Sequence, residues 1–236
     1  MTRALTRTNF NSSKLVRILT DMALVAPVEP GIAFAEKLGQ WVDIAGAISL
    51  RAAHNASPAN AKTATPTGAR AALDEAFDQM RAALANAMTK AVLPLDAEAT
   101  FEPYRRYYLA HQREMELSVR TLRNKVRDAL ANASPALKQL ASLDAAFDAI
   151  LCERENKLFS TLPLLLAKRF EHLRKAHQPL LAESQQADPP EILIKAGAWL
   201  ARFRHELQAV LLAELDARLQ PTEGLIEALN HEKSKQ

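Results

Sequence analysis

Apolar residues recur along most of this chain at the three- and four-residue spacing that marks one face of an α-helix. The first such stretch follows serines that suit a helix N-terminus, and its apolar face consists of Leu15, Ile18, Leu19, Met22 and Val25. Five further stretches repeat the spacing and are separated by proline-rich or polar segments. The predicted helices cover residues 14–25, 32–53, 70–93, 103–132, 135–179 and 190–219.

The stretch 103–132 carries the longest apolar seam, whose members are three or four positions apart throughout. This is close to a heptad repeat, in which helices pair along a narrow apolar stripe. At 1.5 Å per residue the helix would be a rod of about 45 Å. The seam consists of Tyr104, Tyr108, His111, Met115, Val119, Leu122, Val126, Ala129 and Ala133.

Prolines are expected to shape the helices that follow. Ser134 and Pro135 predict a helix start, because serine caps free backbone N–H groups and proline suits the first helical position. Pro163 is expected to kink this helix. Pro221 is expected to end the last long helix and to leave 222–230 as a short terminal helix.

The stretch 32–53 is the least regular of the predicted helices. Gly39 and Gly46 weaken its middle, so the sequence is compatible with a break there. The apolar residues expected in its core are Phe34, Leu38, Trp41, Val42 and Ile48.

These patterns predict an all-α fold, a long antiparallel helical bundle or coiled-coil-like hairpin preceded by a small helical N-terminal segment. The six glycines and the abundance of strong helix formers agree with it. An Ala/Ser/Thr/Pro-rich stretch buries too little apolar surface to fold and is expected to be a flexible linker. The predicted segments are 1–53 (N-terminal), 54–69 (linker), 70–230 (main bundle) and 231–236 (polar tail).

Composition narrows the compartment and the chemistry. The net charge of +3 is only mildly basic, and Cys152 is the sole cysteine, so no disulfide framework is expected. No apolar run reaches the roughly 18–20 residues that cross a bilayer. We therefore expect a cytoplasmic protein without a transmembrane segment.

No catalytic constellation is evident in the sequence. The chain lacks the phosphate-binding glycine motifs, the nucleophile elbow and the HExxH or Glu-x-x-His spacings of metal sites. We expect no enzyme activity, no metal and no cofactor. Near-heptad helices do pair with other helices, so we expect a protein partner of unknown identity, and self-association is a further possibility.

Arginines recur every seven residues along the stretch 103–132, at positions 106, 113, 120 and 127. Seven residues is nearly two helical turns, so these side chains form a stripe about 31 Å long from the first to the last. Such a stripe suits phosphate contacts, so nucleic-acid binding is the alternative function. The candidate interaction surface consists of Arg105, Arg106, Arg113, Arg120 and Arg127.

The same arginines also fit an internal role. If the chain turns near 132–135, antiparallel partners have residue numbers that sum to about 267, and an acidic stripe on the next helix then faces the basic one. Charges beside an apolar seam select register. Arg105 and Arg106 lie beyond this stripe, with no internal partner evident. The expected pairs are Arg123 with Asp144, Arg120 with Asp148, and Arg113 with Glu155.

Several blocks carry a family resemblance, namely FAEKLGQWVDIAGAISL (34–50), YRRYYLAHQREME (104–116), KRFEHLR (168–174) and LLAELDARLQPTEGLIEAL (211–229). They resemble an uncharacterised family of proteobacterial helical proteins known only as a domain of unknown function. The resemblance implies genes beside those for a proton-channel-like inner-membrane protein and an outer-membrane-protein-A-like protein. It therefore implies a non-enzymatic interaction or scaffold protein, a soluble accessory of a cell-envelope or motor-like complex.

Overall fold

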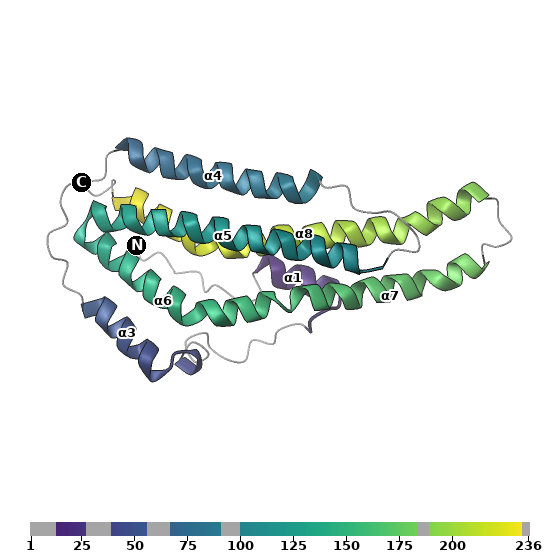
Figure 1. Cartoon of the computed structure of the whole chain (residues 1–236), viewed down its shortest axis with the longest axis horizontal. Coiled ribbons are helices and arrows are strands. Elements are labelled where there is room, and N and C mark those ends of the chain that lie inside the picture. The colour runs from purple at the N-terminus through teal and green to yellow at the C-terminus, as the bar shows by residue number, and fades with distance from the viewer. Residues whose placement is uncertain (1–12, 27–38, 56–66, 91–99, 184–188, 233–236) are drawn as a thin grey trace, which may run out of the picture. The chain divides into compact units, whose positions relative to one another are not determined.

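The fold is all-α, as the sequence predicts. The structure is a computed structural model that describes residues 13–26, 39–55, 67–90, 100–183 and 189–232, and within these ranges it contains helices and no strand (Figure 1). The helices are α1 Lys14–Asp21, α3 Ile44–Asn55, α4 Thr67–Lys90, α5 Glu102–Ala133, α6 Pro135–Phe159, α7 Leu162–Glu183 and α8 Pro189–His231.

The chain forms two compact units, and each unit draws on three separate stretches of sequence. Unit 1 contains the described parts of 1–29, 88–111 and 162–217. Unit 2 contains the described parts of 30–87, 112–161 and 218–236. The helices α4, α5 and α8 therefore contribute residues to both units, although only the last three residues of α4 belong to unit 1. Most of the predicted linker 54–69 and residues 233–236 of the predicted tail lie outside the described residues.

Aromatic rings fill the core of unit 1. The ring of Phe170 on α7 lies 5.1 Å from that of Phe203 and 5.2 Å from that of Trp199, both on α8. Tyr104 of α5 meets Phe203 edge-on at 5.4 Å, a favoured geometry for aromatic pairs. The hydroxyl of the fully buried Tyr108 donates a 2.6 Å hydrogen bond to Glu214. Both seam tyrosines are thus core residues of unit 1.

The C-terminal end of α4 is fixed within unit 1 by hydrogen bonds from side chains. The last carbonyl groups of a helix lack backbone donors and need other partners. The carbonyl of Met88 accepts hydrogen bonds from the Tyr107 hydroxyl at 2.6 Å and from the Gln208 amide at 3.3 Å. Met88 itself is fully buried, so packing and hydrogen bonding act at the same residue.

Unit 2 has a mainly aliphatic core, to which four of the described helices contribute side chains. Its buried side chains include Phe77 and Leu84 of α4, Met115, Val119, Leu122, Val126 and Leu130 of α5, Leu137 of α6, and Leu225, Ile226 and Leu229 of α8. The seam of α5 departs from the prediction only at its end, where Leu130 is buried and Ala129 and Ala133 are half-buried. The step from Val126 to Leu130 follows the 3.6-residue period of an untwisted helix.

Two predicted helix ends are wrong. The helix α1 ends at Asp21 instead of near Val25, because Ala23 adopts a left-handed backbone conformation with φ of 56° that ends a right-handed helix. Pro163 does not kink a continuous helix. The helix α6 ends at Phe159, and Pro163 is the second residue of α7, where a missing N–H leaves no hydrogen bond unmade.

Pro221 does not end the last helix, in contrast to the prediction. The helix α8 passes through it and continues to His231. A proline within a helix removes one backbone hydrogen bond and crowds the preceding turn. Several residues after the proline are buried in unit 2, and their packing holds the helical conformation. They are Thr222, Leu225, Ile226 and Leu229.

The irregular stretch 32–53 does contain a break. Residues 39–41 form a helical turn, and α3 begins after it at Ile44. A carboxylate oxygen of Asp43 accepts a 2.7 Å hydrogen bond from the backbone N–H of Gly46, which caps the new helix. Ile48 is 64% exposed and not a core residue, because α3 packs on α6 through its Gly46 face. Phe34 and Leu38 lie outside the described residues.

Candidate interaction surfaces

Four charged side chains form a partly buried cluster between α5 and α6 in unit 2. Arg123 binds Asp144 through two hydrogen bonds of 2.6 and 2.9 Å and reaches Asp148 at 3.0 Å. Arg127 binds the same two carboxylates at 2.6 and 2.9 Å. Burial tends to lower the pKa of Arg123, but the hydrogen bond and charge of Asp144 outweigh it and raise that pKa. Both guanidinium groups are therefore held in one geometry.

The cluster confirms the expected pairing of Arg123 with Asp144, and it changes the other two expected pairs. Arg127 takes Asp148, because long arginine side chains one helical turn apart both reach the same pair of acids. Arg120 binds Glu116 of its own helix at 2.7 Å instead. Arg113 is exposed and forms no ion pair with any residue that the structure describes.

Arg105 and Arg106 lie in unit 1, in the first turns of α5. They do have an internal partner, contrary to expectation, since Glu102 accepts 2.9 and 3.0 Å hydrogen bonds from the two guanidinium groups. Those bonds lower the pKa of the Glu102 carboxyl. The arginine side chains remain 49% and 78% exposed, so both keep N–H groups facing solvent. Exposed pairs of this kind contribute little to stability.

An ion pair in unit 1 was not predicted from the sequence. Arg169 of α7 binds Glu206 of α8 through two hydrogen bonds of 2.7 and 2.8 Å, and both side chains are nearly buried. Arg202 adds a third bond at 3.0 Å. Burial tends to raise the pKa of Glu206, but the hydrogen bonds from the two arginines outweigh it, so that pKa is lowered. The one sequence signal was a charged residue within an apolar face of α7.

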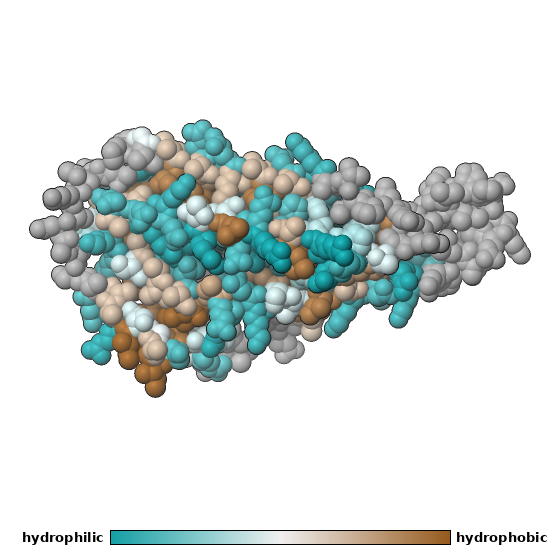
Figure 2. Space-filling view, in the orientation of Figure 1, coloured by the Kyte–Doolittle hydropathy of each residue, from teal (hydrophilic) through white to brown (hydrophobic). Residues whose placement is uncertain are grey.

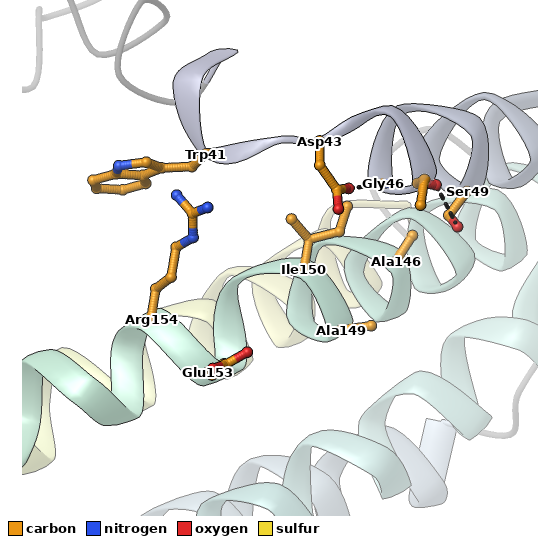
Figure 3. A pocket seen from close by; sticks show the side chains of 10 residues that line it. Trp41, Asp43, Gly46, Ser49, Ala146, Ala149, Ile150, Glu153 and Arg154 are labelled. Atoms are coloured by element: carbon orange, nitrogen blue, oxygen red, sulfur yellow. Dashed lines mark hydrogen bonds between the residues drawn. The ribbon is translucent and has the colours of Figure 1, made fainter.

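A cleft lies between α3 and α6 in unit 2 (Figure 3). It encloses about 390 Å³. Its floor is the contact of Gly46 with Ile150, where a Cβ atom on the glycine would lie 3.1 Å from two atoms of the isoleucine. Figure 3 shows the Arg154 side chain extending from α6 toward the indole of Trp41. The full lining is Trp41, Asp43, Ala45, Gly46, Ser49, Ala146, Ala149, Ile150, Glu153 and Arg154.

The described residues contain neither a cluster of metal ligands nor a membrane-spanning helix. No three or more of their His, Cys, Asp and Glu side chains are grouped so that they could hold a metal ion. None of the described helices is both long enough and apolar enough to cross a bilayer. Cys152 is half-buried, and its sulfur accepts a weak 3.6 Å hydrogen bond from the Asn156 amide.

Comparison with known proteins identifies the family. Residues 1–231 match the family described as "Protein of unknown function (DUF3348)". The chain belongs to this family. No curated protein and no solved structure matches it. The membership covers both compact units and confirms the resemblance seen in the sequence.

Proposed function

We propose that the chain is a non-enzymatic helical interaction protein that acts as a scaffold in the cytoplasm. One observation carries the proposal. On α3, Ile44 is 82% exposed and Ile48 is 64% exposed, one helical turn apart on the same side. Single exposed apolar residues are common, but adjacent large ones on one helix face are typical of a surface that another molecule covers.

The complex that we propose for this protein is an accessory assembly of the cell envelope or of a motor-like machine. The gene neighbourhood implied by the family resemblance supports this assignment. A soluble helical protein can serve such a complex without spanning the membrane, by binding a segment of a membrane-anchored partner.

Affinity purification from native cells tests the proposal. The tagged full chain is compared with an I44D/I48D variant, and co-purified proteins are quantified by mass spectrometry. We expect envelope proteins that are recovered with the wild type and lost with the variant. An L117D variant is the matched control, because Leu117 is 65% exposed in unit 2 but stands alone on its helix face. Equal recovery with all three proteins would contradict the proposal.

Nucleic-acid binding is the second candidate function. The observation that favours it is the exposure of Arg105, Arg106 and Arg113 on α5. Each phosphate contact contributes about one unit to the slope of log affinity against log salt concentration. Binding to a labelled duplex is measured from low to moderate salt, with the three arginines replaced by glutamine. A loss of roughly three units of slope supports this candidate, and salt-independent binding excludes it.

A further inference from the structure

The helix α3 is apolar on both of its sides. Its inner side packs Gly46 against Ile150 of α6, and its outer side presents Ile44 and Ile48 to solvent. Figure 2 shows this apolar surface over the position of α3 in Figure 1. A helix that is apolar all round is normally covered on both sides. Among the residues that the structure describes, none covers the outer side of α3, where Ile44 is 82% and Ile48 64% exposed.

Two exposed arginines lie on α3 and in the adjoining cleft. Arg51 lies three residues after Ile48, on the same outward side of α3, and α3 contains no acidic residue. Arg154 lies in the adjoining cleft. Both arginines are exposed, and neither forms an ion pair with a described residue. They contrast with Arg123 and Arg127 of the same unit, whose charges are satisfied by carboxylates.

Two carboxylates near the cleft limit what can bind there. One carboxylate oxygen of Asp43 accepts a hydrogen bond from the backbone N–H of Gly46, so fewer of its acceptor positions remain for a ligand. Glu153 is exposed on α6 and lines the cleft beside Arg154. The positive charges are therefore Arg51 on the outward side of α3 and Arg154 on α6, and the negative charges are Asp43, directly before α3, and Glu153 on α6. A bound segment would need acidic groups over α3 and would gain nothing from them over Glu153.

We infer that α3 and the cleft beside it dock an amphipathic helix of a protein partner, with aliphatic residues one turn apart and acidic residues on either side of them. This inference rests on the proposed function and specifies where the partner binds and what its chemistry is. The aliphatic residues pack on Ile44 and Ile48, and the acidic residues pair with Arg51 on one side and with Arg154 on the other. Helix-in-groove recognition uses anchors at this spacing.

The concave cleft favours a protein segment over a lipid surface. A bilayer contacts the outermost side chains of a helix and does not enter a recess beside it. The cleft lies next to the exposed isoleucines and is walled by the half-buried Trp41. A side chain from a docked helix can enter it, and the indole offers that side chain a large apolar contact.

Site-specific photo-crosslinking in native cells tests the inference. A photoreactive benzophenone amino acid replaces Ile48 in the full chain, and in separate variants it replaces Ala52, one turn further on α3, or Leu117 as the control. We expect the two α3 positions to crosslink the same helical segment of a partner protein, one with net negative charge and aliphatic residues one turn apart. The control position should not crosslink that segment.

A synthetic peptide of the crosslinked segment then serves as the probe for purified protein. Trp41 fluorescence in a W199F background reports binding near α3, since these are the two tryptophans of the chain. Reversing both charges, as in R51E/R154E, should weaken binding at least about tenfold and reduce its salt dependence. Far-UV circular dichroism checks that each variant folds.

Several outcomes would overturn the inference. In the crosslinking experiment they are α3 positions that crosslink only lipid, only a second copy of this chain, or a basic segment of a protein. In the peptide experiment the contradicting outcome is equal binding by R51E/R154E and by the wild type. If affinity purification recovers partners with the wild type but not with I44D/I48D, the outcomes above refute only the claim that the partner binds through an acidic helix. If no partner is recovered at all, the proposed function fails with it.

Discussion

Burial separates the arginines of α5 into two kinds. The Arg123 side chain is 13% exposed and bridges two helices, whereas the Arg106 side chain is 78% exposed and binds only a neighbour on its own helix. A buried charge that loses its partner has a large desolvation cost, and an exposed one is rehydrated by water. The inter-helix cluster therefore specifies how α6 packs on α5, and the exposed pairs leave their charges open to other molecules.

Asp144 is the residue whose loss should disrupt the inter-helix cluster most. It accepts hydrogen bonds from both Arg123 and Arg127. Replacing it in D144N keeps the size but removes the charge, so we expect a loss of about 1–3 kcal/mol in the free energy of unfolding. Urea titration measures it. D128N, at an exposed position of α5, should change the value by no more than about 0.5 kcal/mol. Equal effects would contradict the register role.

Glu206 should make the stability of the protein depend on pH. Its pKa in the folded state is below the ordinary value of 4.5. A lowered pKa stabilises the fold above the unfolded-state pKa, and the contribution disappears as the pH falls through the folded-state pKa. The wild type should therefore lose more unfolding free energy than E206Q between pH 6 and pH 3. Urea titrations at several pH values test this, with E223Q at an exposed site as the control.

The two ion-pair systems show which contacts can be read from a sequence. Arg123 and Asp144 lie on helices joined by the short turn at Ser134, so counting back from the turn fixes their register. Arg169 and Glu206 are 37 positions apart, and the same count from the centre of the five residues 184–188 pairs Arg169 with residue 203 and so misses Glu206 by three positions. Arg120 binds within its own helix because Glu116, four residues away, is reached without any tertiary contact.

At the scale of elements, α3 depends on one small residue. Gly46 lets the helix approach Ile150 so closely that a larger side chain would collide with it. In G46L we expect α3 to separate from α6 while the remaining helices stay folded, because overpacking costs about 1–3 kcal/mol at that contact. Hydrogen exchange of residues 44–55 should then rise sharply.

Gly224 provides the matched control for Gly46. No atom lies within 4 Å of the position that its Cβ would take, and the residue is exposed on α8. Alanine is a better helix former than glycine, so G224A should raise the free energy of unfolding by about 0.5–1 kcal/mol. Unchanged exchange in α3 of G46L would show that the Gly46 contact does not hold this helix in place.

Helix ends were predictable where they depend on local chemistry. The Ser134 hydroxyl accepts a hydrogen bond from Leu137 N–H at 3.2 Å, which is the cap that its position before Pro135 predicts. Pro221 is a local signal for the end of a helix, but the burial of residues beyond it keeps α8 intact. Ile48 fits a helical core pattern, and only the packing of α3 shows which side faces α6.

At the scale of the whole molecule, the division into two units follows from contacts between distant parts of the chain. Unit 1 brings α1 next to α8, where Lys14 binds Asp216 at 3.0 Å across 202 positions. Unit 2 brings α4 next to the end of α8, where Asn230 donates to Asp74. Apolar periodicity identifies helices but not which of them pack together.

Continuity of long helices through both units predicts cooperative unfolding. Both α5 and α8 are single helices with residues in unit 1 and in unit 2. If one unit unfolds, part of each helix loses its packing, and helices that lack tertiary contacts are marginal in water. We therefore expect both units to unfold in one transition in urea.

The two tryptophans report on the two units separately. Trp41 lies in unit 2 and Trp199 in unit 1, so W199F and W41F each leave one fluorescent probe. The fluorescence midpoints of the two variants, corrected by far-UV circular dichroism for any change in overall stability, should coincide. A Trp41 transition at lower urea, with Trp199 and circular dichroism unchanged, would mean that unit 2 or α3 opens by itself. Hydrogen exchange of α3 against α5 in the wild type then distinguishes these cases, because only opening of unit 2 also exposes the amides of 112–133.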